Sequence, residues 1–327
     1  MLNAHNVLQL GWQSAFGTAN GTATRKLQNV SSFKLRPELE TRALDQLRGT
    51  MAPTHQTTLD RYLSSATAET SDVDFEELNY WLEMLFGTDA TPTGADPYVR
   101  DYAAPLTTAP TPHFATLQFG QTGEVWQMQD ASVTSLTLSG AANSGVSVGA
   151  SLMGGKVVAG TLAALPDLTT GTRMTGCMAS VAIETWDGNT FTALASSAFS
   201  WELSVNANRE YHNFLGECTP TASYDNKWSG QLKLSLELND STDDHLIAML
   251  AAANTILQKR VRIIYTVGAT TTLRSMTIDF AGHTMQAPEL FQDKNGLMTY
   301  DLVLDGVYNP TASQWLSIET KAALATV

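Results

Sequence analysis

Apolar and polar residues alternate along most of this chain in runs of about six positions, the period of a strand with one face in a core and the other in solvent. The clearest runs lie at 133–138, 231–237 and 274–280. We therefore predict a mainly β protein. Weaker runs predict further strands near 114–119, 124–128, 146–152, 260–266, 282–288 and 297–304, with turns at 187–189 and 293–296.

Two segments follow the helical period instead. In residues 74–86, apolar residues recur at helical spacing, Asp74 and Glu77 can cap the start, and Gly87 can end the helix. Residues 243–251 repeat this arrangement after an acidic cap. We expect each segment to form one amphipathic helix lying on a sheet, with its carboxylates on a solvated face.

Each helical segment follows similar landmarks, so the pattern occurs twice. Equivalent landmarks are 166–168 residues apart: Gly49 and Gly216, Pro53 and Pro220, Tyr62 and Trp228, Leu78 and Leu246. Such self-similarity predicts a duplicated domain. The first domain would span 1–170, with a long arm at 37–66 and a proline-rich loop at 88–112, and the second would span 171–327, with an arm at 205–230.

The charge balance argues against nucleic-acid binding. The chain has 19 Lys and Arg residues against 32 Asp and Glu residues, a formal net charge of -13. No surplus of cations is present to neutralise a phosphate backbone, so we predict that DNA is not held tightly.

Motifs for catalysis, cofactors and metals are missing. The glycine-rich stretch at 149–157 places its lysine one position late for a phosphate loop, the six histidines show no ligand spacing, and no GxSxG occurs. We predict no enzyme and no catalytic, cofactor or metal site. Cys177 and Cys218 have no CxxC spacing, and we expect two buried thiols. No apolar run of membrane-spanning length occurs, and the first residues predict no signal peptide.

The two arms carry the candidate contact residues. A basic residue next to an aromatic one occurs at equivalent places in both arms, and such residues often anchor protein contacts, although a structural role within each domain fits equally well. The candidates for contacts between subunits or rings are Pro53, Arg61, Tyr62, Pro220, Lys227 and Trp228.

In pattern and order, the chain resembles the tail tube proteins (major tail proteins) of long-tailed, non-contractile bacteriophages. The resemblance rests on Gly-Trp-Gln-Ser-Ala-Phe-Gly-Thr-Ala at 11–19, the strand and arm after 31–38, Asp-Phe-Glu-Glu-Leu at 74–78, and the strand at 131–140. It covers nearly the whole chain. It implies two tandem β-sandwich or barrel-like domains, each flanked by one helix.

The resemblance also implies a function. Such proteins form stacked rings that make the hollow tail tube, and a duplicated chain implies trimeric, pseudo-hexameric rings, with a hexamer as the alternative. Expected partners are other copies of the chain, stacked rings, a tape measure protein in the lumen, and tail terminator and tail tip proteins. DNA would pass into the host without tight binding. The protein would assemble in the host cytoplasm, reside in the virion tail and not insert into membranes.

Two other classes of protein fit the residues less well. A capsid decoration protein or a receptor-binding adhesin would also be β-rich and oligomeric, but an adhesin is expected to present an aromatic-rich tip. A hydrolase on a β-scaffold would need clustered histidines or carboxylates and a pocket. Self-assembly into tubes separates the first class from the tail tube interpretation, and a convergent polar site would favour the second.

Overall fold

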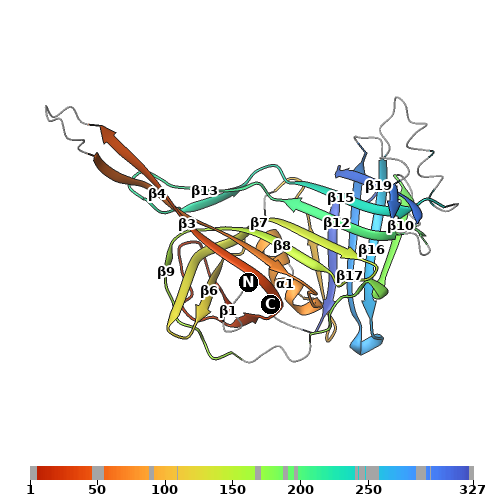
Figure 1. Cartoon of the computed structure of the whole chain (residues 1–327), viewed down its shortest axis with the longest axis horizontal. Helices are drawn as coiled ribbons and strands as arrows, with labels where there is room; N and C mark the ends of the chain where they lie inside the picture. Colours follow the sequence, from red (N-terminus) through yellow and green to blue (C-terminus); the bar gives the residue numbers. More distant parts are fainter. Residues whose placement is uncertain are drawn as a thin grey trace.

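A long antiparallel sheet runs through both halves of the chain (Figure 1). The computed structural model describes residues 6–45, 55–87, 92–108, 110–165, 171–186, 191–194, 198–239, 242, 247, 258–284, 292–294 and 296–323. From one edge to the other, the long sheet consists of β3 (Val30–Asp45), β4 (His55–Thr70), β8 (Ser147–Gly154), β7 (Glu124–Ala141), β12 (Ala198–Asn206), β15 (Ser229–Glu237), β19 (Leu297–Gly306) and β18 (Gln292–Lys294).

Each half adds a second layer of strands. In the first half, β1 (Val7–Trp12) pairs with β2 (Arg25–Leu27) and β6 (Ala115–Gln121), and the start of β7 pairs with β6 and β9 (Val157–Ala159). The second half uses β10 (Ala179–Thr185), β11 (Thr192–Ala193), β16 (Gln258–Val267), β17 (Arg274–His283) and β20 (Leu316–Ala322). β5 (Tyr98–Ala103) crosses over to pair with β20, and short 3-10 turns lie at Gly176–Met178 and Thr270–Thr272.

The pairings of the first half recur in the second half in the same order. β1 pairs with β2 and β6 as β10 pairs with β11 and β16, and β7 pairs with β6 and β9 as β17 pairs with β16 and β20. Register and face repeat as well, because Phe33 and Ala68 form a pair of buried residues, as do Trp201 and Leu234. Their offsets of 168 and 166 residues fall within the spacing of the sequence landmarks.

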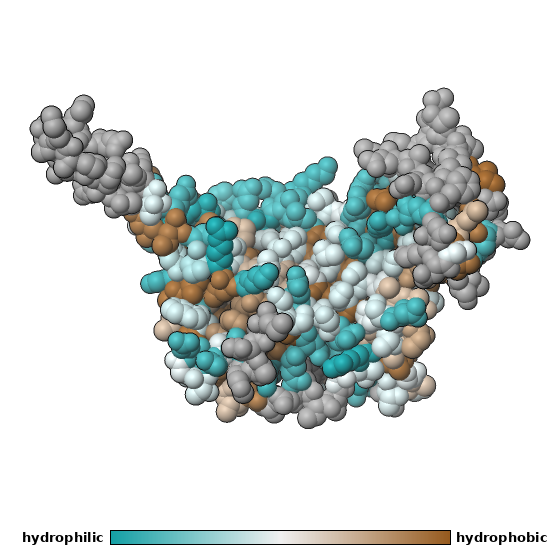
Figure 2. All heavy atoms as spheres, viewed as in Figure 1, coloured by the Kyte–Doolittle hydropathy of each residue, from teal (hydrophilic) through white to brown (hydrophobic). Residues whose placement is uncertain are grey.

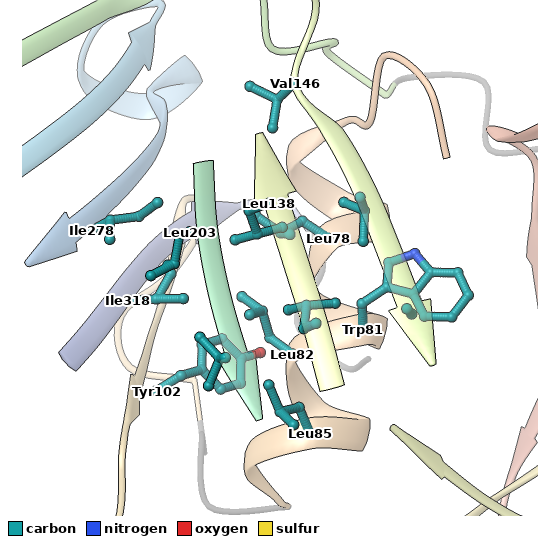
Figure 3. Close-up of a cluster of buried hydrophobic side chains, with 14 of the residues drawn as sticks. Leu78, Trp81, Leu82, Leu85, Tyr102, Leu138, Val146, Leu203, Ile278 and Ile318 are labelled. Atoms are coloured by element: carbon teal, nitrogen blue, oxygen red, sulfur yellow. The ribbon is translucent and has the colours of Figure 1, made fainter. Parts of the chain in front are cut away.

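The described part of the chain contains one helix, α1 (Phe75–Phe86), as the apolar period predicts. The Asp74 side chain accepts a hydrogen bond from the Glu77 backbone N–H at 2.5 Å and so caps the helix. Gly87, with a φ of 93°, ends it, and an added Cβ there would lie 2.4 Å from the Thr111 carbonyl oxygen. α1 lies in the core, where Figure 3 shows Leu78, Trp81, Leu82 and Leu85 among side chains from both halves.

The expected solvated face of this helix is wrong. All residues of α1 are buried, because the helix is wedged between β7 on one side and β5, β17 and β20 on the other. Its carboxylates are therefore held inside the protein. Glu76 lies 3.4 Å from Arg274 of β17, and Glu83 lies 3.7 Å from Arg100 of β5. Strands that are distant in sequence thus bury a helix whose own pattern is amphipathic.

The Glu77 carboxyl makes folding dependent on pH. Burial raises the pKa of Glu77 from 4.5 to about 7, and the nearby Asp74 adds to this, although the Asn29 backbone N–H donates to the carboxylate at 3.0 Å and opposes the shift. The folded protein therefore holds this proton more tightly than the unfolded chain does. Stability from this group is full below pH 4.5 and is lost as the pH rises through about 7.

We expect Glu77→Gln to remove this pH dependence. Between about pH 5 and about pH 8, the wild-type free energy of unfolding should fall by roughly 3 kcal/mol more than that of the variant, because glutamine carries no titrating proton. Urea unfolding at both pH values measures the difference. Glu124→Gln, at an exposed position on β7, is the control. An unchanged pH slope in the Glu77 variant would contradict the assignment.

The structure confirms the mainly β class and the strongest predicted strands. The large sheet does not close into a barrel. The runs near 124–128 and 132–138 form one strand, β7, which passes from the outer layer into the long sheet. The second predicted helix, the turn at 187–189 and residues 285–288 lie outside the described residues, except that Ile247 has helical backbone.

Two further expectations concern the cysteines and membrane-spanning segments. Cys177 and Cys218 are both exposed, so the expectation of buried thiols is wrong, because one lies in a 3-10 turn and the other in a hairpin loop. Within the described ranges, no helix is long and apolar enough to cross a membrane.

Candidate assembly surfaces

One face of the long sheet is polar across both halves of the chain. Side chains alternate along its strands, so those opposite the core share this second face. Most carry hydroxyl, amide or carboxylate groups: Ser65, Thr67, Glu69, Ser151, Ser135, Thr137, Ser139, Ser147, Ser200, Glu202, Ser204, Gln231, Lys233, Asp301 and Asp305. Hydrogen bonds and ion pairs connect neighbours, with Ser139 and Ser147 at 2.9 Å and Lys233 and Asp301 at 2.8 Å.

The polar face carries an excess of negative charge. Glu69, Glu202, Asp301 and Asp305 lie on this face with Lys233 of β15. The edge strand β3 adds Glu38, Lys34 and Arg36 beside Ser65 and Thr67, so carboxylates exceed cations on the face by two. The Asp301 carboxylate raises the pKa of Lys233, so this lysine stays charged while it is paired. A surface of hydroxyls and carboxylates offers phosphates few cationic partners.

The β3 edge of the long sheet is open in the part of the chain that the structure describes, and the opposite edge is open except at the end of β19, where Asp305 and Gly306 pair with β17. β3 pairs with β4 alone, and β18 pairs with β19 alone. Residues 36–41 of β3 are exposed, and Leu39 is 59% exposed. Pro37 lacks a backbone N–H, which suits an edge strand. Unpaired backbone groups of such an edge are able to pair with another strand.

The two halves also extend paired strands into arms. The first arm consists of residues 41–45 of β3 and 55–60 of β4, and the second arm consists of β13 (Arg209–His212), β14 (Ala222–Asp225) and the loop between them. In both hairpins the register slips by one residue at the base of the arm. Figure 1 shows β13 running beside β3 and β4.

The second arm packs against the base of the first arm. The Tyr62 backbone N–H donates to the Cys218 carbonyl at 2.7 Å, and the Arg61 guanidinium donates to the Tyr211 carbonyl. The Tyr211 ring is buried beside Leu63, and its hydroxyl donates to the Met153 carbonyl at 3.0 Å. Burial also raises the pKa of Tyr211, so the hydroxyl keeps its proton. The arms are therefore joined within one chain.

Arg209 anchors the second arm to the first half. Its side chain is fully buried and makes a bidentate pair with Asp225 at 2.5 and 2.9 Å. The same guanidinium donates to the carbonyls of Met84 and Leu85, at the end of α1, and of Val133 in β7, all at 3.0–3.1 Å. A cation at a helix C-terminus also interacts favourably with the helix dipole.

The structure separates the predicted contact residues. Arg61 and Tyr62 lie together against the second arm, as described above. Lys227 is exposed, whereas Trp228 is buried with its ring 5.2 Å from that of Phe86. Pro220 is buried, and Pro53 lies outside the described residues. Intermolecular roles for these residues stay predictions.

Sequence reasoning missed the most buried arm residues, Arg209 and Tyr211. Apart from Asp225, which is 16 residues from Arg209, their partners lie 58 to 150 residues away in sequence, so no local motif marks them. It also missed the tip of the second arm, where Phe214 is 58% exposed and Leu215 is 106% exposed. Two adjacent apolar residues within a polar loop are a sequence pattern from which a contact surface could have been predicted.

Little in the described residues suggests catalysis. No group of three or more His, Cys, Asp or Glu side chains among them could hold a metal ion. Comparison with known proteins points elsewhere: the family model described as phage tail tube protein matches residues 3–302. No curated protein sequence matches the chain.

Proposed function

Because the chain belongs to the phage tail tube protein family, we propose that its copies close into rings, and that stacked rings form the hollow tube through which phage DNA passes into the host. A tail tube protein is a structural component of the virion tail. We further propose that each ring contains three copies, and that each copy contributes two tandem domains, 1–170 and 171–327. The repeated strand pairings support this division.

The pairing of β7 with β12 carries the proposal. It joins the first half to the second through seven residue pairs, from Ser200 and Ala141 to Asn206 and Ser135. β3 occupies in the first half the position that β12 occupies in the second, yet within the described residues β3 has no partner on that side. The same kind of pairing between copies would extend the sheet around a ring and remove its open edges.

The polar face is the proposed lining of the tube. It continues across both halves without interruption, and its other side is sealed by the core. Its carboxylates would repel a polyanion that carries about one charge per 1.7 Å of duplex axis. DNA would then slide past the wall without being held. Figure 2 shows hydrophilic residues gathered along the upper margin of the molecule, between the arms and the opposite end.

The remaining partners follow from a tube of this kind. A tape measure protein would occupy the lumen before DNA does, and terminator and tip proteins would cover the two ends of the stack. Assembly would take place in the host cytoplasm. The tip of the second arm, where Phe214 and Leu215 are exposed, would reach the neighbouring ring.

Electron microscopy of the purified protein across a concentration series tests the proposal, with mass measured by light scattering. We expect rings of threefold mass and hollow tubes at high concentration, and a reconstruction in which residues such as Glu202 and Ser151 line the channel. A ring of six chains would contradict the trimer. A compact monomer at every concentration, including in the presence of preformed tail tips, would contradict self-assembly.

A further inference from the structure

The second arm docks on the first half at a defined position along β4. β4 pairs with β8 as far as Ser64 and Gly154, and beyond that pair β4 continues without β8. The second arm lies along this part of β4, where the Tyr62 backbone N–H donates to the Cys218 carbonyl and the Arg61 guanidinium donates to the Tyr211 carbonyl. The space beyond the end of β8 is thus filled by a hairpin from the other half of the chain.

The equivalent space in the second half is an open groove. β15 pairs with β19 as far as Gln231 and Asp305. The first two residues of β15, Ser229 and Gly230, lie beyond that pair and pair with β12 only. A groove of about 480 Å³ lies there. Its walls are residues 225–228 at the base of the second arm, residues 306–308 at the end of β19 and just after it, Trp315, and residues 105–108.

The groove wall holds one buried donor without an acceptor and two exposed apolar side chains. Trp228 is 9% exposed, and its indole Nε1 is buried without a hydrogen-bond acceptor. Its counterpart in the first half is Tyr62, 166 residues earlier, whose backbone N–H has its acceptor, the Cys218 carbonyl, in the docked second arm. Leu106 and Tyr308, on the groove walls, are 50% and 49% exposed. A buried donor without an acceptor is costly, and an arriving carbonyl would relieve that cost.

We propose that this groove receives the first arm, residues 41–45 and 55–60, of a second copy of the chain. The inference rests on the proposed ring. Within one chain, β12 pairs with β7, and the arm that continues from β12 fills the space beyond β8. Between copies, β3 pairs with the open edge of the neighbour, and the arm that continues from β3 fills the space beyond the neighbour's β19. Trp228 then donates its indole N–H to a backbone carbonyl of that arm.

Photo-cross-linking tests the contact directly. Tyr308 is replaced by p-benzoylphenylalanine in the full-length chain, and copies labelled with heavy nitrogen are mixed with unlabelled copies before irradiation. We expect mixed heavy and light cross-links to peptides from the range 37–61. Cross-links between copies that reach only other regions would overturn the proposal. Cross-links to 37–61 from a protein that forms no rings would keep the docking and overturn the ring.

Substitutions in the groove give a second readout. Leu106→Glu should weaken ring formation at least about tenfold, because docking would bury its charge. Trp228→Phe, which keeps a ring but removes the donor, should weaken it about fivefold. Trp126→Glu, at a 56% exposed position on β7 outside the groove, is the matched control. Circular dichroism checks that each variant is folded. If wild type forms rings and Leu106→Glu forms them equally well, the groove is not the seat of the arm.

Discussion

Replacing Arg209 with alanine should lower the free energy of unfolding by about 3–5 kcal/mol, the cost of breaking a buried ion pair by removing one partner. The Asp225 side chain is 1% exposed and would be left buried without its counter-ion. The carbonyls of Met84, Leu85 and Val133 would also lose their donor. Urea unfolding of the monomeric protein measures the loss.

The control for Arg209 is a lysine that also makes an ion pair but lies in solvent. Lys233 is 2.8 Å from Asp301, and its side chain is 49% exposed. Lys233→Ala should cost less than about 1 kcal/mol, as exposed ion pairs usually do. Equal losses for the two variants would mean that the Arg209 network does not stabilise the junction between the second arm and α1.

Local pattern predicts the strands and α1 because each depends on its own residues. A strand such as β15 alternates apolar and polar side chains, and α1 has both a capping aspartate and a terminating glycine. These signals act over fewer than about ten residues. The burial of Glu76 depends instead on β17 and on Ala323 after β20, and the Glu77 carboxylate accepts from the backbone of Gln28 and Asn29, so their partners come from far along the chain. No local pattern reports such a contact.

The arms illustrate the same limit at the candidate assembly surfaces. The landmarks Gly49 and Gly216, with Pro53 and Pro220, mark two segments of similar pattern in the sequence. They do not indicate that the second arm folds back onto the base of the first, since Arg61 and Tyr62 meet it through backbone carbonyls. Carbonyl acceptors have no sequence signature, because every residue carries one. The groove beside Trp228 cannot be predicted from the sequence either, because its walls come from separate segments of the chain.

The edge strand β3 and the docked second arm suggest how a chain of this kind avoids aggregation before assembly. The open β3 edge carries Pro37 and charged residues, including Arg36 and Glu38. Proline and charge on an edge strand disfavour indiscriminate pairing. The second arm, by contrast, is already docked on its own chain. Ring closure would therefore use the two ends of the long sheet and one free arm per copy, which favours a closed ring over an irregular network.

The tip of the second arm provides the last prediction, which separates stacking from ring closure. Phe214 and Leu215 are exposed at the loop between β13 and β14, far from the β3 edge in sequence. Burying two such side chains against another ring would contribute about 3 kcal/mol per copy. Several copies act together in one ring, so the contributions multiply in the stacking equilibrium.

We therefore expect the double variant Phe214→Ser and Leu215→Ser to form rings of wild-type mass that no longer stack into tubes. Serine removes the apolar surface without adding charge, and the loop lies outside the Arg209 and Tyr211 anchors, so the fold should be retained. Trp126→Ser, which removes an exposed apolar side chain from β7, is the control and should leave tubes intact. Electron microscopy and sedimentation distinguish rings from tubes. Tubes of normal length from the double variant would exclude the tip from stacking, whereas loss of the rings themselves would place the loop in the contact between copies of one ring.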